Sequence, residues 1–109
     1  MDRKDRLCLE KIINEINTLE LLLRDYTSEK FLEDEMAKRA VSMTLLNIGE
    51  ISTLLSKEFI SSTSNIPWPL IRGLRNRAAH GYHSLRMKDI WTTIQRDIPK
   101  LKQQLKELL

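Results

Sequence analysis

The sequence predicts an all-α fold, and three observations support this. Apolar residues recur every three or four positions through four long stretches, the periodicity of helices buried on one side. The chain has only three glycines and three prolines, too few for the many turns of an all-β fold. Hydrophobic residues make up 41% of its 109 residues, enough for one core. We therefore expect a single domain over residues 1–109.

The first predicted helix covers about residues 2–25. Its apolar stripe consists of Leu9, Ile12, Ile16, Leu19 and Leu23. Tyr26-Thr27-Ser28 then breaks the pattern, and Ser28 is the expected N-cap of the next segment.

A second helical stretch runs from about residue 29 to 58, as a short turn followed by a long helix. One of its stripes contains Val41, Leu45, Ile48, Ser52, Leu55 and Phe59. A second stripe beside it contains Met36, Ala40, Met43, Ile51 and Leu54, so this helix is expected to touch more than one neighbour. Gly49 lies in mid-helix, where glycine is unfavourable, and it is expected to mark a close helix crossing. Glu50 and Glu58 are interpreted as ordinary surface charges.

The third predicted helix follows a polar loop at residues 61–65. Pro67 and Pro69 open it, because proline is tolerated in a first helical turn, and Gly81 is a usual stop signal. Trp68 is expected to be an apolar anchor.

The fourth helix is predicted over about residues 88–108, with a kink at Pro99. Its stripe contains Ile90, Trp91, Ile94, Ile98, Leu101, Leu105 and Leu108. Four helices joined by short connections predict an antiparallel up-down four-helix bundle, with room for one short extra helix.

Composition limits where in the cell the protein is expected to be found. The lone Cys8 excludes an internal disulfide and a zinc site made of several thiolates. No apolar run approaches the length of a membrane span, and the charged N-terminus does not resemble a signal peptide. We expect a cytoplasmic protein with no membrane association.

Charge is unevenly distributed along the chain. Between Phe59 and Lys88 there is no Asp or Glu, and five basic residues give this segment a charge of +5 within a chain of net charge +3. A basic zone of this kind suits an anionic ligand such as RNA, although a solvated helix face explains charge excess equally well.

Residues 71–83 hold both histidines of the chain and are the main candidate for a functional site. Read as a helix, this stretch has an apolar face and a polar face centred on Arg72. The polar face gathers Arg75, Asn76, His80 and Tyr82, more chemistry than a solubilising surface needs.

The segment 75–82 has the pattern Arg-x4-His-x-Tyr, which resembles the signature of the HEPN superfamily. The match is closest to its HepT-like branch of small toxins encoded with minimal nucleotidyltransferases. The phrases at residues 47–50, 66–68, 73–77 and 91–99 are also similar to that branch, in the same order and at compatible spacing.

The resemblance implies a metal-independent endoribonuclease that works as a homodimer and needs no cofactor. It implies that Arg75 and His80 of two subunits line one composite cleft, with Asn76 as the polar residue that follows the arginine. Arg72 would assist in binding phosphate. It further implies that the partner nucleotidyltransferase, acting as antitoxin, silences the protein by adding AMP to Tyr82.

General chemistry supports such a site. Cleavage of RNA through its 2′-hydroxyl needs a base and an acid, and histidine can serve as either near neutral pH. Arginine stays protonated and can hold two phosphate oxygens while charge builds on them. Because one chain supplies a single motif histidine, two chains most simply supply both base and acid.

Other interpretations of the same residues remain open. Arg75 could form a structural ion pair with a glutamate of another helix, His80 could cap a helix end, and Tyr82 could be a packing residue. His80 and His83 lack the further ligands that a metal site needs. As a whole, the chain could instead be a non-catalytic nucleotide- or substrate-binding subunit of a nucleotidyltransferase, or a helical adaptor.

Overall fold

The computed structural model describes the backbone of all 109 residues and every side chain except that of Ser84. Six α-helices and one short 3₁₀ helix follow one another along the chain, so the predicted all-α class is confirmed. The elements are α1 (Arg3–Leu22), α2 (Ser28–Glu33), α3 (Glu35–Ser52), α4 (Lys57–Ser62), α5 (Trp68–Ala78), η1 (Tyr82–Ser84) and α6 (Met87–Leu108). None of the helices in the described part of the chain combines the length and apolar character needed to span a membrane.

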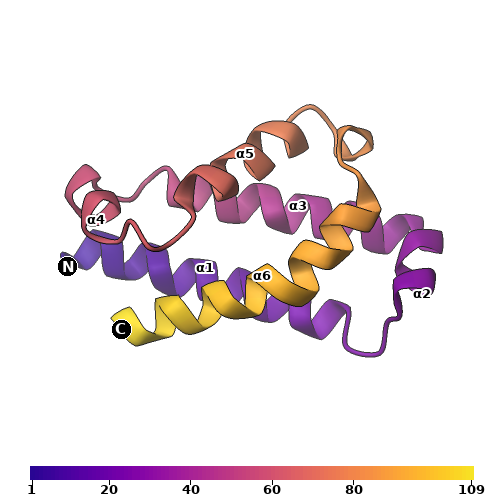
Figure 1. Cartoon of the computed structure of the whole chain (residues 1–109), viewed down its shortest axis with the longest axis horizontal. Coiled ribbons are helices and arrows are strands. Elements are labelled where there is room, and N and C mark those ends of the chain that lie inside the picture. Colours follow the sequence, from indigo (N-terminus) through magenta and orange to yellow (C-terminus); the bar gives the residue numbers. More distant parts are fainter.

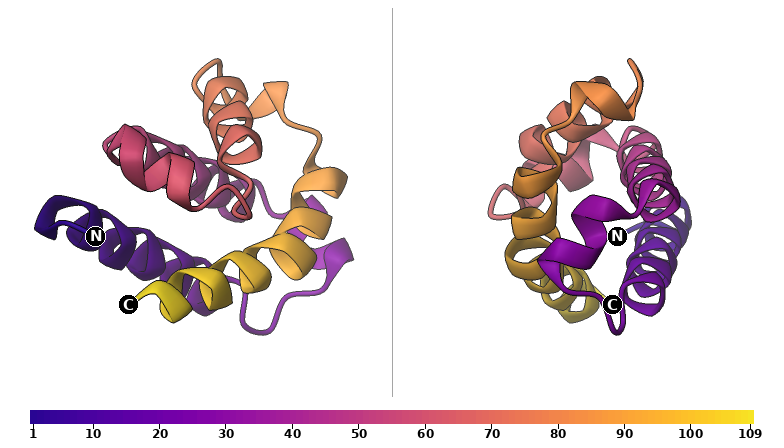
Figure 2. Two further views of the ribbon diagram at one scale, coloured as in Figure 1. Left: turned by 60° about the vertical axis from the view of Figure 1, so that its left-hand side comes forward. Right: turned by 90° about the vertical axis from the view of Figure 1, so that its right-hand side faces the viewer.

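Helix α3 is the central element of the molecule. It packs against α5 on one side and α1 on the other, while α6 crosses α1, and α2 contacts both α3 and α6 (Figure 1). The two chain termini lie at the same end (Figures 1 and 2). The helix carrying the candidate site is therefore held by the best-packed helix of the fold.

The core contains most of the apolar stripes that the sequence predicts, although Leu108 at the end of the α6 stripe is 37% exposed. The α1 stripe is buried throughout, as is the first stripe of α3 with its continuation into α4. Trp68 is 2% exposed and its Nε1 donates to the Thr63 hydroxyl, which confirms its role as an anchor. Trp91 is only half buried and stacks against Phe31.

Two details of the predicted elements need correction, and a third agrees with the prediction. Thr27, not Ser28, is the N-cap of α2, because its hydroxyl accepts the Lys30 backbone N–H. A short helix, α4, covers residues 57–62, part of which was expected to be loop. Helix α6 contains Pro99 and changes direction partway along its length, which agrees with the prediction of a single, kinked helix (Figure 1).

The second stripe of α3 is not part of the core. Met36, Met43 and Leu54 are exposed, at 78%, 57% and 54%, and Ala40 is half buried. Only Ile51 packs partly against the core. In the monomer, one face of α3 therefore exposes apolar side chains to solvent.

Gly49 allows α3 and α5 to cross closely. A Cβ atom at Gly49 would lie 2.1 Å from the Cβ of Arg75, far closer than atoms can approach. The prediction that Gly49 marks a helix crossing is thus confirmed, and α5 carries Arg75 at the point of contact.

Gly49→Ala should destabilise the fold by about 1–3 kcal/mol, because the added methyl group forces the two helices apart. Gly73→Ala is the matched control: no atom lies within 4 Å of a Cβ at that position, and alanine favours a helix by about 1 kcal/mol. Urea unfolding followed by circular dichroism should show a lower free energy of unfolding for Gly49→Ala and a higher one for Gly73→Ala, each compared with wild type. A neutral Gly49→Ala would contradict the crossing.

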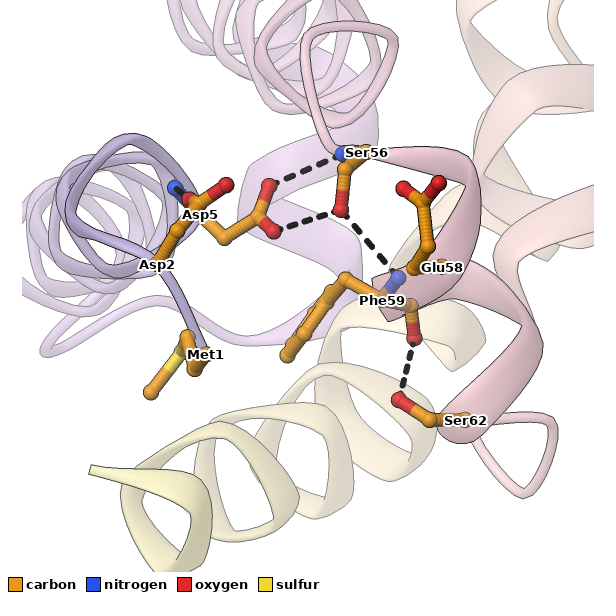
Figure 3. Close-up of a pocket in the computed structure, with 7 residues that line it drawn as sticks. All are labelled: Met1, Asp2, Asp5, Ser56, Glu58, Phe59 and Ser62. Atoms are coloured by element: carbon orange, nitrogen blue, oxygen red, sulfur yellow. Dashed lines mark hydrogen bonds between the residues drawn. The ribbon is translucent and has the colours of Figure 1, made fainter.

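A buried carboxylate joins α1 to the start of α4. Asp5 is 2% exposed and accepts hydrogen bonds from the Ser56 backbone N–H (2.8 Å) and hydroxyl (2.6 Å), beside a surface pocket of about 460 Å³ (Figure 3). Burial alone would raise the pKa of the Asp5 carboxyl. The hydrogen bonds from Ser56 outweigh it, so the pKa lies below its ordinary value of 3.8.

Because the folded-state pKa of Asp5 is lowered, its contribution to stability is present above pH 3.8 and is lost as the pH falls through the folded value. Asp5→Asn should therefore reduce the free energy of unfolding by about 1–3 kcal/mol at neutral pH and by progressively less in acid. Denaturant titrations across this pH range test the prediction. Asp89→Asn is the control, because the Asp89 side chain is 71% exposed. If Asp5→Asn lowered the free energy of unfolding equally at every pH, the prediction would be contradicted.

Candidate functional site

Arg75 lies at the crossing of α5 and α3, where Gly49 lets its backbone approach. Its Nε donates to Glu50 Oε1 at 2.5 Å, and its Nη1 donates to Asn76 Oδ1 at 3.0 Å. The side chain is 35% exposed, and the guanidinium carries more N–H donors than these two bonds use. Arg75 is thus fixed on one side by its own chain and keeps donors free for an external anion.

The ion pair corrects one expectation and confirms another. The sequence predicts an ordinary surface charge at Glu50, but in the structure Glu50 orients the motif arginine. The alternative in which Arg75 pairs with a glutamate of another helix is therefore confirmed. Such a pair is compatible with binding an anion, because Glu50 occupies only part of the guanidinium.

His80 lies in the turn that ends α5. The helix stops at Ala78, and its last hydrogen bonds tighten, since the His80 and Gly81 N–H groups donate to the carbonyls of Arg77 (3.1 Å) and Ala78 (3.0 Å). The imidazole is exposed to solvent. His80 therefore belongs to the same short segment as Arg75 but sits beyond the regular helix, where a ligand can reach it.

Gly81 reverses the chain direction after His80. Its φ of 106° lies in the region that only glycine adopts freely, and a Cβ there would also meet the His83 ring at 2.7 Å. The polar face expected to run continuously through residue 83 is therefore interrupted here. Tyr82 does not continue a line on the helix that starts at Arg75.

Tyr82 instead reaches the opposite end of α3. Its hydroxyl donates to Glu35 Oε2, and the Arg39 guanidinium carbon lies 4.5 Å from the ring centroid. The hydrogen bond to Glu35 raises the pKa of the Tyr82 hydroxyl. The same bond, assisted by Lys38, lowers the pKa of Glu35.

Two separate places on α3 thus receive the motif residues. Arg75 contacts Glu50 and Tyr82 contacts Glu35, positions about 22 Å apart along a helix of 1.5 Å rise per residue. The structure brings Arg75 and Asn76 into contact, and separates both from Tyr82. A nucleotide attached to Tyr82 would therefore not lie beside Arg75 of the same chain.

The remaining predicted residue, Arg72, lies one turn before Arg75. It is exposed and lines a surface pocket of about 420 Å³ that also contains Lys57. Two basic side chains, Arg72 and Lys57, thus line the same pocket.

Sequence reasoning missed the three α3 residues that organise the site: Glu35, Arg39 and Glu50. Their spacing along α3 carries no signature by itself, because charged residues at such intervals are common on exposed helix faces. The available signal was Gly49, which marked where α5 crosses and hence which neighbouring glutamate would meet Arg75. Among the side chains that the structure describes, no three of His, Cys, Asp and Glu gather into a metal-binding group.

Comparisons with known proteins agree on one family. A family model described as ribonuclease HepT-like matches residues 12–108. "Putative RNase TTE0752" of Caldanaerobacter subterraneus subsp. tengcongensis is 37% identical over 93% of this chain and 90% of its own length. "Probable ribonuclease HepT" of Thermococcus cleftensis is 32% identical over 99% of this chain and 98% of its own.

No solved structure matches the chain at a significant level. The family assignment therefore depends on sequence, and it agrees with the helical fold and with the motif segment at the end of α5. The match to the family model spans all of the helices except the first part of α1. The chain belongs to the HepT-like ribonuclease family of the HEPN superfamily.

Proposed function

We propose that this protein is a metal-independent endoribonuclease in which Arg75 binds the scissile phosphate and His80 transfers protons. The observation that carries the proposal is the state of Arg75: Glu50 and Asn76 hold its guanidinium, its side chain is still 35% exposed, and an exposed histidine follows five residues later. Preorganised cations of this kind stabilise the charge that develops on a phosphate during cleavage. Family membership supplies the substrate class, RNA.

In this mechanism, the ribose 2′-oxygen attacks the adjacent phosphorus while a histidine accepts the hydroxyl proton. The bond to the 5′-oxygen breaks, and a second histidine donates a proton to that oxygen. Arg75 neutralises the negative charge on the phosphate oxygens, and Asn76 and Glu50 keep its guanidinium in place. Arg72 holds a neighbouring phosphate.

Because each chain supplies a single motif histidine, His80, we propose that the active form is a homodimer of antiparallel helix bundles. The exposed apolar stripe of α3 is a suitable interface, since Met43 lies in a pocket bounded by Ala78, Gly81 and Tyr82 of the motif segment. Dimerisation along this stripe would bring the two α5 ends together and bury Met36 and Met43.

We also propose that the protein acts as a toxin whose antitoxin is a minimal nucleotidyltransferase that attaches AMP to Tyr82. The hydroxyl of Tyr82 lies at the surface, beside two cations that could hold a phosphate. Because His80 is only two residues away, a nucleotide attached there would obstruct access to the histidine. Modification would thus switch the nuclease off.

Arg75→Ala and His80→Ala should each reduce RNA cleavage more than 100-fold, since each removes a group that acts on the reacting phosphate. Cleavage of labelled RNA by purified protein with a chelator present measures the effect. Arg77→Ala and His83→Ala are matched controls and should retain activity. Undiminished cleavage by folded Arg75→Ala or His80→Ala would refute the proposed roles, and tight ATP binding without any RNA cleavage would favour a nucleotide-binding subunit.

Met43→Asp should convert a dimer of the 12.8 kDa chain into a monomer and abolish cleavage, because a charge in the middle of an apolar interface opposes association. Light scattering coupled to size-exclusion chromatography reports the mass. Leu21→Asp, at an α1 residue that is 67% exposed, is the control and should leave the mass unchanged. An active Met43→Asp monomer would refute the shared cleft.

A further inference from the structure

Three charged side chains of α3 surround the hydroxyl end of Tyr82. Glu35 Oε2 accepts the hydrogen bond from the hydroxyl, and the Arg39 Nε lies 3.7 Å from the same oxygen. Lys38 Nζ lies 2.9 Å from the other carboxylate oxygen of Glu35. On η1, the His83 ring stands edge-on to Tyr82 with centroids 6.4 Å apart. The hydroxyl therefore faces one carboxylate and two cations.

The other tyrosine of the chain offers an internal comparison. Tyr26 donates to Asp34 Oδ2 at 2.6 Å, and Lys30 lies 4.2 Å above its ring. Asp34, however, is also the N-cap of α3, since its Oδ1 accepts the Ala37 backbone N–H at 3.0 Å. That carboxylate has a clear structural task.

Glu35, one residue later, lies in the first turn of α3 but is not its N-cap. Its recorded polar contacts, among the described residues, are with the side chains of Tyr82, Lys38 and Arg39. Glu35 is also exposed, so an enzyme could reach the pair. Glu35 therefore places a carboxylate, with two neighbouring cations, directly at a solvent-accessible hydroxyl.

We infer that Glu35 is the proton acceptor for nucleotidyl transfer onto Tyr82, and that Arg39 and Lys38 hold the transferred phosphate; this rests on the proposed modification of Tyr82. The phenol oxygen attacks the α-phosphorus of a nucleoside triphosphate bound to the partner nucleotidyltransferase. As the new O–P bond forms, the bond to pyrophosphate breaks and the phenol proton passes to Glu35. Pyrophosphate leaves, and Glu35 later loses the proton to water.

The protonation states suit this role. The hydrogen bond that the Tyr82 hydroxyl donates to Glu35 raises the pKa of this hydroxyl, so the phenol keeps its proton at neutral pH and needs a base in order to react. The pKa of Glu35 is lowered by the same bond and by Lys38, so its carboxylate is ionised and able to accept a proton.

The local charge also suits the product. One carboxylate and two cations leave a single positive charge beside the phenol oxygen, and an attached AMP brings one negative phosphodiester. Arg39 can donate two hydrogen bonds to phosphate oxygens without leaving its helix position. The modified side chain would therefore be held on α3.

The test uses the minimal nucleotidyltransferase proposed as partner, together with ATP and Mg²⁺, and follows AMP incorporation at Tyr82 by mass spectrometry. Glu35→Gln keeps the side-chain shape but cannot accept the proton, so its rate should fall about 100-fold or more at neutral pH. The deficit should shrink at alkaline pH, where the phenol ionises without a base. Tyr26→Phe should react at the wild-type rate.

Two further measurements separate this role from docking or folding. Glu35→Gln should bind the nucleotidyltransferase as tightly as wild type. In a Tyr26→Phe background, absorbance titration should show that Glu35→Gln moves the pKa of Tyr82 back toward 10.0, its ordinary value.

The outcomes are distinguishable. A wild-type rate in Glu35→Gln, lost partner binding, or a deficit that persists at alkaline pH would overturn the role of Glu35 alone. Absence of AMP on wild-type Tyr82 would overturn the proposed modification, and the inference with it. Neither result would affect the nuclease assignment, which Arg75→Ala and His80→Ala test separately.

Discussion

The close approach of α5 to α3 at Gly49 is the constraint on which the candidate site depends. Without a side chain at residue 49, the two helices meet backbone to side chain, and Arg75 enters the space that a Cβ would fill. This contact sets how far α5 slides along α3. It thereby determines that Glu50 meets Arg75 and that the chain, after turning at Gly81, meets Glu35 with Tyr82.

Helix α3 consequently contributes residues to two sites, one near each of its ends. Near its C-terminal end Glu50 orients the arginine proposed to bind phosphate, and at its first residue Glu35 receives the tyrosine proposed to carry AMP. Between them lies the exposed apolar stripe with Met43, suited to a second copy of the chain. RNA cleavage, dimerisation and modification of Tyr82 would thus all depend on residues of α3.

Much of the fold could be predicted from periodicity, because the stripes of α1, α3 and α6 are long and regular. The short helix α4 could not, since its six residues are too few to show a period and are stabilised by the Ser56 cap held by Asp5. The sequence pattern predicts Arg75, Asn76, His80 and Tyr82 as site residues. It does not predict their partners, because contacts between distant segments depend on how two helices cross. The prediction of a continuous polar face was wrong beyond Gly81. The sequence indicates that the helix stops there, but it does not indicate in which direction the chain turns.

The turn at Gly81 has a consequence for how activity would return once a group is removed from Tyr82. A group carried by Tyr82 would stand near the exposed imidazole, whereas the guanidinium remains paired with Glu50 at a distant point of α3. Inactivation would then block access without dismantling the anion-binding arrangement. Removing the blocking group would release a cleft that is already assembled, and recovery would need no rearrangement of the helices.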